Sequence, residues 1–166
     1  MNINFQTLGK RQTLEILSWR YNPPYDYYNF DSQILMSKPC GANLSYWIDP
    51  KNHFFAIVNS SEALEGFCSF GADARVTGGD YSDYCLDIGM GIRPALTGQG
   101  NGRRYAQAVA RFGMLQYKAQ RLRVTIAEFN RRAQQVWASL GFEVTERFTK
   151  TDSDMAFVVM TGEIDK

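Results

Sequence analysis

Three glycines at alternate positions, Gly98, Gly100 and Gly102, give the strongest chemical signal in the sequence. Glycine lets successive backbone N–H groups turn towards one point, and it leaves no Cβ in the way of a ligand. A helix that begins at such a turn adds unpaired N–H groups and the positive end of its dipole. Arg103 and Arg104 stand in the first helical turn, where they oppose that dipole unless an anion lies alongside. The pattern predicts an anion site suited to a diphosphate.

The residues around this turn resemble those of a known family. A strand, then R-P-x-L-T-G-Q-G-N-G-R at 93–103, then a helix, is similar to the acetyl-CoA loop of the GNAT superfamily of N-acetyltransferases. A second segment, NRRAQQVWASLGF at 130–142, looks like that family's N-x-x-A-x-x-x-Y-x-x-x-G-F pattern. Two positions depart from the family. Thr97 stands where the loop usually carries Arg or Gln, and Trp137 stands where many members carry a tyrosine that protonates the departing thiolate.

The resemblance implies acetyl-CoA as the cosubstrate and assigns residues to it. Backbone N–H groups of Gly98–Gly102 would bind the diphosphate. The edge of the central strand at 90–92 would pair with the pantetheine amides, and a backbone N–H there would stabilise the oxyanion. The predicted coenzyme-binding residues are Met90, Gly91, Ile92, Thr97, Gly98, Gln99, Gly100, Asn101, Gly102, Arg103 and Asn130.

Some of these residues also have plain structural interpretations. Gly89 and Gly91 fit a close backbone approach to a ligand, but a bulge or tight packing also explains them. Asn130 would reach the coenzyme in family members, and a simple helix cap explains it equally well. We expect no metal site, because nothing in the sequence has the spacing of metal ligands.

Acetyl transfer from a thioester to an amine also requires a proton acceptor, because an alkylammonium has a pKa of about 10. Asp87 is the first candidate: it is the one charge in an apolar strand, where burial should make a carboxylate a stronger base. Some superfamily members carry an acidic residue at this position. The alternative is that Asp87 pairs with Arg93 or another cation. Glu128, at the end of the next strand, is the second candidate for the base.

Departure of the thiolate lacks its usual acid, because the indole of Trp137 does not give up a proton. A missing general acid typically costs about 10²–10⁴-fold in rate. Core filling is the simpler interpretation of Trp137. Water, Tyr105 or Tyr84 could replace the acid, and the sequence does not choose among them.

The acceptor is expected to meet the early segment 21–30, YNPPYDYYNF, which supplies two prolines and four tyrosines. The resemblance places acceptor selectivity in this region, so Tyr25 and Tyr28 are the predicted substrate-binding residues. A rigid aromatic loop packed over the core is the structural alternative, and both interpretations can hold together.

The hydrophobic pattern supplies the elements that would hold these residues. It predicts a single α/β domain over 1–166, GNAT-like, with a mixed, mostly antiparallel central sheet of about seven strands flanked by about four helices. Helices are expected at 12–19, 101–118 and 131–140, with a helical turn at 33–37. Strands are expected at 3–8, 53–59, 64–70, 84–92, 122–127, 143–149 and 155–161.

Composition narrows the class of protein. Hydrophobic residues make up 45% of the chain and charged residues 21%, as in ordinary globular proteins. The net charge of +1 gives no support to a nucleic-acid or membrane-surface role. No apolar run reaches about 18 residues, and no signal-peptide pattern begins the sequence, so we expect a cytoplasmic protein. The three cysteines are expected to be free thiols, and the single histidine, His53, argues against a Cys/His nucleophile.

The sequence therefore predicts a cytoplasmic, acetyl-CoA-dependent N-acetyltransferase in which a primary amine attacks directly, without a covalent enzyme intermediate. The acceptor is a small-molecule or peptide amine that the sequence does not identify, and a homodimer is among the oligomeric states left open. A non-catalytic acyl-CoA-binding or regulatory protein is the alternative, motivated by Trp137. A dinucleotide-binding oxidoreductase fits poorly, because Arg103 stands where the G-x-G-x-x-G fingerprint needs glycine.

Overall fold

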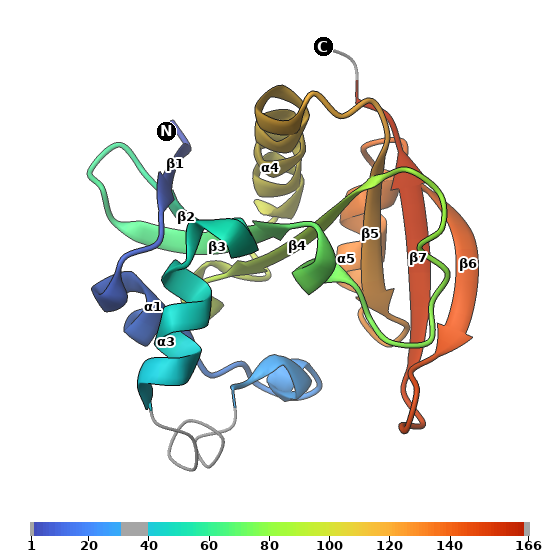
Figure 1. The fold of residues 1–166 in the computed structure, drawn as a ribbon, viewed down its shortest axis with the longest axis horizontal. Helices are drawn as coiled ribbons and strands as arrows, with labels where there is room; N and C mark the ends of the chain where they lie inside the picture. The colour runs from blue at the N-terminus through green and yellow to red at the C-terminus, as the bar shows by residue number, and fades with distance from the viewer. Residues whose placement is uncertain (1, 31–39, 165–166) are drawn as a thin grey trace. The chain divides into compact units, whose positions relative to one another are not determined.

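The computed structural model describes residues 2–30 and 40–164. The described strands pair in one sheet in the order β1-β2-β3-β4-β5-β7-β6 (Figure 1). The β4–β5 pair is parallel, and the β1–β2, β2–β3, β5–β7 and β6–β7 pairs are antiparallel. This confirms the predicted mixed α/β fold. The chain divides into two compact units: unit 1 is Met1–Ser69 with Met90–Thr97, and unit 2 is Phe70–Gly89 with Gly98–Lys166.

Unit 1 is built on an antiparallel run of strands, β1 (Asn4–Thr7), β2 (Phe54–Val58) and β3 (Leu64–Phe70), with the helices α1 (Lys10–Leu17) and α3 (Cys40–Ile48). The strands expected at 53–59 and 64–70 are confirmed, and they pair with each other antiparallel as a hairpin. Apolar residues from α1 and the strands form one core, which contains Leu8, Ile16, Trp19, Phe54, Ala56, Val58 and Leu64.

The helix α3 was not predicted from the sequence. Its segment CGANLSYWI contains Gly, Asn and Ser, which are weak helix formers, so propensity alone does not mark it. Tertiary packing explains it: Leu44 is buried, and the Trp47 ring lies 4.5 Å from the Phe54 ring, centroid to centroid. The helical turn expected at 33–37 lies outside the described residues.

Unit 2 contains α4 (Gly102–Tyr117), β5 (Leu122–Ala127), α5 (Arg131–Ala138), β6 (Glu143–Thr149) and β7 (Ala156–Gly162), together with the first half of β4 (Leu86–Ile92). One face of α4 is buried, and it includes Ala106, Val109, Ala110 and Gly113. A Cβ at Gly113 would lie 2.5 Å from the Phe70 ring, so this residue lets α4 approach the sheet closely.

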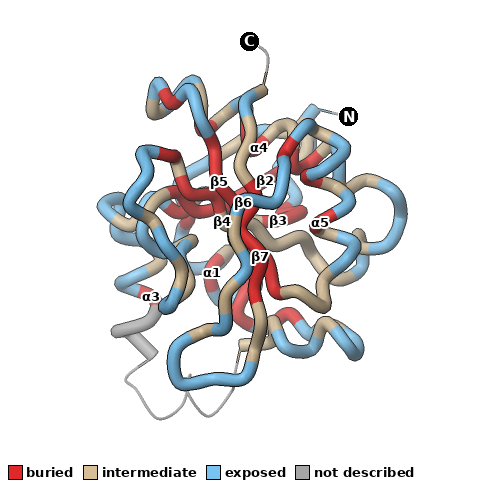
Figure 2. Tube along the Cα trace, turned by 90° about the vertical axis from the view of Figure 1, so that its right-hand side faces the viewer, coloured by how far each residue is buried: buried red, intermediate tan, exposed pale blue. Residues whose placement is uncertain are grey.

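The two faces of the sheet in unit 2 carry different residues, because side chains alternate along a strand. The Leu86 side chain lies next to Gly113 of α4, and Leu86 is paired with Leu122 in the strand register. Both side chains therefore point to the face of the sheet that α4 covers. Asp87 and Arg123, the next pair in the register, point to the opposite face, which the loop before β4 covers (Figure 1). Figure 2 shows β7 buried through its centre and β6 exposed along most of its length.

Within the described ranges, none of the helices is both long and apolar enough to cross a bilayer.

Candidate functional site

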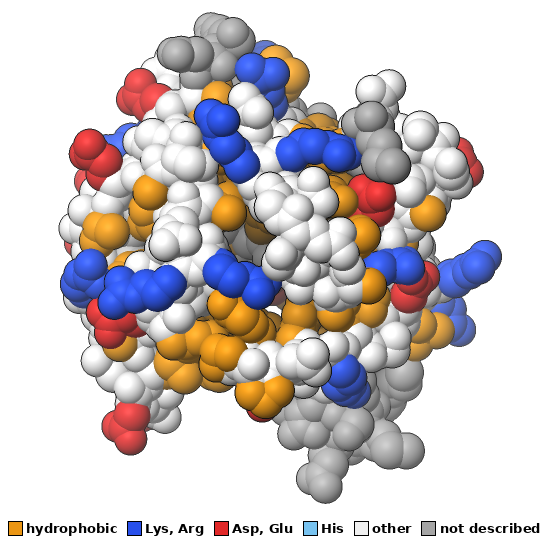
Figure 3. Space-filling model, turned by 180° about the vertical axis from the view of Figure 1, so that it is seen from behind, with side chains coloured by type: hydrophobic (Ala, Val, Ile, Leu, Met, Phe, Trp, Pro, Cys, Tyr) orange, Lys and Arg blue, Asp and Glu red, His pale blue; other side chains and the backbone are white. Residues whose placement is uncertain are grey.

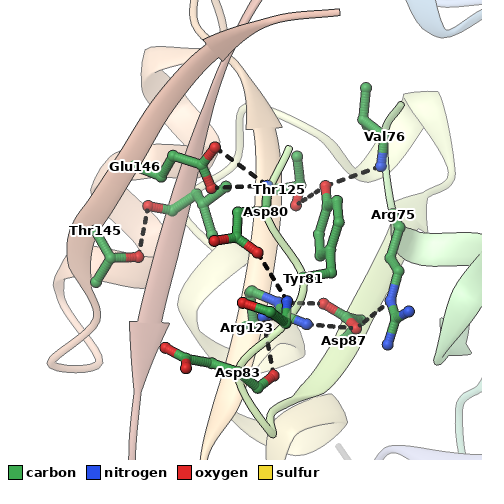
Figure 4. Close-up of polar contacts among 12 residues, drawn as sticks. Arg75, Val76, Asp80, Tyr81, Asp83, Asp87, Arg123, Thr125, Thr145 and Glu146 are labelled. Atoms are coloured by element: carbon green, nitrogen blue, oxygen red, sulfur yellow. Dashed lines mark hydrogen bonds and ion pairs between the residues drawn. The ribbon is translucent and has the colours of Figure 1, made fainter. Parts of the chain in front are cut away.

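Asp87 is buried in unit 2 with both carboxylate oxygens in ion pairs (Figure 4). Arg123 donates from Nε to Oδ1 at 2.5 Å and from Nη2 to Oδ2 at 3.0 Å, and Arg75 donates from Nε to Oδ2 at 2.8 Å. The side chains of Asp87 and Arg123 are only 2% and 3% exposed. The hydrogen bond to Asp87 raises the pKa of Arg123, so the buried guanidinium stays charged. This is the cation-paired arrangement that was the alternative to a base, with Arg123 and Arg75 in place of Arg93.

Tyr81, from the loop before β4, closes over this ion pair. Its ring lies between the Arg75 and Arg123 guanidinium groups, whose carbons are 5.4 and 4.7 Å from the ring centroid (Figure 4). Its hydroxyl accepts a hydrogen bond from the Val76 N–H at 2.9 Å and lies 3.0 Å from the Thr125 hydroxyl. The loop therefore covers the Asp87 carboxylate and holds the two guanidinium groups around it.

Glu128 has the opposite environment, just beyond β5. Its side chain is 42% exposed, and Arg147 donates to Oε1 at 3.0 Å. Such an exposed ion pair is worth only about 0–1 kcal/mol, so Glu128 can leave it easily. Asp87 is paired with Arg123 of β5 in the strand register. Arg123 precedes Glu128 by five residues, so Asp87 and Glu128 lie roughly 16 Å apart along the strand direction. The two carboxylates do not lie at one point, and a catalytic role for either stays a prediction.

The glycine turn before α4 has the backbone conformation that glycine adopts most readily. Gly98 and Gly100 have φ angles of +74° and +78°. A Cβ at Gly100 would find no atom within 4 Å, so there is open space on that side of the turn. In the described chain the N-terminus of α4 has no side-chain cap and no acidic residue in its first turn. A helix N-terminus without a side-chain cap or a nearby carboxylate is a feature that favours a bound anion.

Arg104 adds a signal that the predicted set of residues did not contain. Its Nη2 atom is buried and has no hydrogen-bond partner among the described residues. A buried cationic donor without an acceptor is costly, and an anionic ligand would supply the acceptor. Arg103, its predicted neighbour, is exposed. The Arg104 guanidinium carbon lies 5.7 Å from the centroid of the Tyr105 ring. Binding of a phosphate group by the first turn of α4 stays a prediction.

Thr97 and Asn130, both predicted to bind the coenzyme, make local hydrogen bonds. The Thr97 hydroxyl donates to the Pro94 carbonyl at 2.8 Å, in unit 1. In unit 2, Asn130 Oδ1 accepts from the Ala133 N–H at 3.1 Å, which confirms the predicted helix cap. Contact of either residue with a coenzyme stays a prediction, as it does for Gln99 and Asn101.

In unit 1 the end of β4 directs its backbone groups to two different edges. The Arg93 N–H donates to the Glu65 carbonyl of β3 at 2.8 Å. Because successive residues point their N–H and C=O groups to opposite edges, Gly91 also faces β3, whereas Met90 and Ile92 face the other edge. Of the three residues predicted to pair with pantetheine, only Met90 and Ile92 can therefore do so through backbone groups.

Tight packing explains why position 91 is glycine. A Cβ at Gly91 would overlap the ring of Phe67, and one at Gly66 would lie 2.7 Å from the Gly91 carbonyl oxygen. This is one of the two plain interpretations that the sequence left open for Gly91.

The early tyrosines of unit 1 form a short 3-10 turn, Tyr25–Tyr28, in which the Tyr27 and Tyr28 rings meet edge to face at 5.4 Å. Their contact with a substrate stays a prediction. The structure adds Tyr21, whose hydroxyl donates to the Ile92 carbonyl at 2.8 Å, and an ion pair between Glu15 and Arg93. Sequence reasoning missed both contacts, because 71 and 78 residues separate the partners.

Trp137 fills the core of unit 2, as the simpler interpretation predicted. It is 3% exposed, and its ring lies 4.8 Å from the Phe142 ring. The two tyrosines considered as a replacement acid differ sharply, because Tyr84 is 87% exposed and Tyr105 is 4% exposed.

Unit 2 also contains a cavity of about 360 Å³, lined by charged residues that include Asp80, Asp83, Glu146, Arg121 and Arg123. None of the predicted site residues lines it. Among the described residues no three His, Cys, Asp or Glu side chains gather in a way that could hold a metal ion.

The comparisons with known proteins agree with the predicted family and fold. A family model described as an acetyltransferase (GNAT) domain matches residues 10–143. Among curated proteins, none matches the chain significantly in sequence.

Solved structures share the fold at low sequence identity. A GNAT-family acetyltransferase from Bacillus anthracis superposes with a TM-score of 0.70 at 13% identity, covering 98% of this chain and 95% of the other. Spermidine N-acetyltransferase from Vibrio cholerae in complex with CoA and spermine gives 0.67 at 14%, covering 97% and 95%. A candidate acetyltransferase from Salmonella typhimurium with its cofactor acetyl-CoA gives 0.64 at 18%, covering 99% and 95%.

Proposed function

The chain belongs to the GNAT family of acetyltransferases, and we propose that it moves an acetyl group from acetyl-CoA to a primary amine of a small molecule or peptide. The observation that carries the proposal is the glycine turn at the start of α4, with Gly98 and Gly100 at positive φ and open space at Gly100. The similar structures that contain acetyl-CoA, or CoA and spermine, support this donor and an amine acceptor. Because one family model spans segments of both units, we treat 1–166 as a single acetyltransferase domain. We also propose that the protein acts in the cytoplasm.

Residues of the glycine turn would hold the diphosphate through their backbone amides, and Arg104 would pair its free Nη2 with a phosphate oxygen. Met90, through its backbone groups, and Ile92, through its N–H, would hold the pantetheine amides, since the Ile92 carbonyl already accepts from the Tyr21 hydroxyl. Acetyl-CoA supplies an activated thioester, whose carbonyl carbon the amine attacks directly. A backbone N–H at the Met90 and Ile92 edge would stabilise the developing oxyanion.

For the proton acceptor we propose Glu128, directly or through water. Its carboxylate is partly exposed and, within the described part of the chain, is held by one weak ion pair, so it can accept a proton and release it to solvent. Asp87 fits this role less well, because both of its oxygens accept from guanidinium groups and its side chain is 2% exposed. We propose that Asp87 instead fixes Arg75, Arg123 and the loop above them.

The coenzyme site is tested with a matched pair of glycine variants. Gly100 and Gly141 have φ angles of +78° and +88°, and neither would bring a Cβ within 4 Å of another atom. Gly100→Ala and Gly141→Ala should therefore cost similar stability, of about 1 kcal/mol from the strained φ. Only Gly100→Ala should weaken acetyl-CoA binding, by about tenfold or more, in calorimetric titration. Equal affinities in the two variants would contradict the proposed diphosphate site.

The activity is tested by mixing the protein with acetyl-CoA and a broad panel of amines and following thiol release. Turnover that depends on an amine supports the proposed reaction. Tight acetyl-CoA binding without turnover across the panel would favour the non-catalytic acyl-CoA-binding alternative.

A further inference from the structure

The segment that follows α1 is closed by mutual hydrogen bonds between two residues. The Tyr21 N–H donates to Asn29 Oδ1 at 2.7 Å, and Asn29 Nδ2 donates to the Tyr21 carbonyl at 3.4 Å. Inside this closure, the Tyr25 N–H donates to the Asn22 carbonyl at 2.9 Å, and the Asn29 N–H to the Asp26 carbonyl at 3.0 Å. The Tyr25–Tyr28 turn is therefore held by its own hydrogen bonds, before any substrate arrives.

The same segment is fastened to β4 by the Tyr21 hydroxyl, which donates to the Ile92 carbonyl at 2.8 Å. The Ile92 carbonyl and the Arg93 N–H belong to one peptide unit, so they point in opposite directions. Because the Arg93 N–H points to β3, the Ile92 carbonyl points away from β3. Tyr21 therefore meets β4 on the edge that Met90 and Ile92 share, which is the edge proposed for the pantetheine arm. Burial raises the pKa of Tyr21 to about 12, so the hydroxyl remains a donor over the whole range in which the protein would be assayed.

A second contact between the early segment and β4 involves the next residue, Arg93. The ion pair between Glu15 of α1 and Arg93 attaches the preceding helix to the residue after Ile92. Both side chains are more than one third exposed, so this pair alone contributes little stability. Together with the Tyr21 contact, it joins the early segment of unit 1 to one short stretch of β4.

We propose that Tyr21 and Asn29 are positioning residues for the amine acceptor, because they hold the Tyr25–Tyr28 turn at a fixed place beside the Met90 and Ile92 edge. The inference rests on the proposed function and deepens it. A turn that is already ordered removes part of the entropy cost of binding, so its loss weakens acceptor binding more than coenzyme binding. Neither residue needs to touch the reacting atoms.

The test uses Tyr21→Phe, which removes only the hydroxyl, and Asn29→Ala, which opens the closure. Tyr46→Phe is the control, since it removes a hydroxyl from a tyrosine of α3 that lies in the same unit and is 44% exposed. Losing one hydrogen bond corresponds to about a fivefold change. Each test variant should raise the KM for the best amine about fivefold and leave the KM for acetyl-CoA within about twofold of wild type. Asn29→Asp, which keeps the Oδ1 acceptor, should recover most of the effect.

Hydrogen exchange at the backbone amides of residues 25–29 gives a readout that does not depend on activity. Protection at these amides should fall in Asn29→Ala. Lost protection with an unchanged acceptor KM would overturn the inference, and so would a KM for acetyl-CoA that rises as much as the acceptor KM. A wild-type protein that binds acetyl-CoA but acetylates no amine would overturn the proposed function and this inference with it. Turnover by the wild type with unchanged acceptor KM in both variants would overturn the inference alone.

Discussion

At the scale of single residues, two carboxylates with the same chemistry have opposite surroundings. Asp87 is enclosed by guanidinium groups, and Glu128 stands half in solvent with one exposed partner. Removing one partner of a buried ion pair leaves an uncompensated charge, whereas an exposed pair is nearly neutral in free energy. This difference in burial is our reason for proposing a structural role for Asp87 and the base role for Glu128.

The substitution Asp87→Asn should lower the free energy of unfolding by about 3–5 kcal/mol, because Arg123 would remain buried and charged without its partner. Urea denaturation measures this loss. Glu128→Gln is the control, for which we expect a change below about 1 kcal/mol. A neutral effect of Asp87→Asn would contradict the structural role proposed for this ion pair.

The same two variants should separate in their pH–rate profiles. If Glu128 is the base, Glu128→Gln should lower kcat/KM by about 10²-fold or more and remove the acidic limb of the profile. Asp87→Asn, measured where it remains folded, should keep that limb. The reverse pattern would return the base role to Asp87.

Tyr21 predicts a dependence of stability on alkaline pH. Its pKa is raised from 10.0 to about 12 by burial, so the unfolded chain loses this proton at lower pH than the folded chain. Its contribution is intact below pH 10, and the folded state loses stability as the pH rises from about 10 to 12. Denaturant unfolding at pH 9 and pH 11 measures the slope. Tyr21→Phe should show a smaller loss across this interval, and an identical loss would contradict the burial of this hydroxyl.

At the scale of elements, glycine serves two distinct purposes in this chain. Gly98 and Gly100 allow positive φ angles in the turn before α4, whereas Gly91 and Gly113 allow strands and helices to approach aromatic rings. The sequence shows only that each residue is glycine. The surroundings show which glycines are available to a ligand and which are needed for packing.

Gly91→Ala should destabilise the fold by about 1–3 kcal/mol, because the new methyl group would overlap the Phe67 ring. Thermal unfolding measures this change. Combining it with Phe67→Leu should recover part of the loss, since the two side chains compete for the same space. Simple additivity of the two single changes would show that Phe67 is not the residue that excludes a side chain at position 91.

At the scale of the whole molecule, charge gives no sign of a polyanionic partner. The net charge is +1, and the face in Figure 3 shows separate Lys and Arg side chains with Asp and Glu among them, not one continuous basic surface.

If the glycine turn is specific for the coenzyme, acetyl-CoA should raise the free energy of unfolding, whereas other nucleotides should not. At a concentration of 100 times its Kd it should add about 2.7 kcal/mol, or a rise in Tm of about 5–10 °C for a chain of this size. NADH and a short DNA duplex at the same concentration should leave Tm unchanged. A shift with NADH equal to that with acetyl-CoA would contradict the specificity proposed for the glycine turn.

The sequence by itself determined the order of the strands, three of the helices and the turn before α4. Hydrophobic periodicity and helix-capping patterns are local properties, so they predicted the strands β2, β3 and β5, the helix α4 and the Asn130 cap, all of which the structure confirms. The family resemblance was confirmed for the same reason, because its motifs are contiguous in the chain.

Tertiary structure alone decided which charges are paired and which edges face outward. Arg75 and Arg123 reach Asp87 from 12 and 36 residues away, and Tyr21 reaches Ile92 across 71 residues, so no local pattern encodes these contacts. The helix α3 depends on packing in the same way, because its own residues are weak helix formers. Local patterns fix what each segment can become, whereas burial and pairing depend on distant segments brought together by folding.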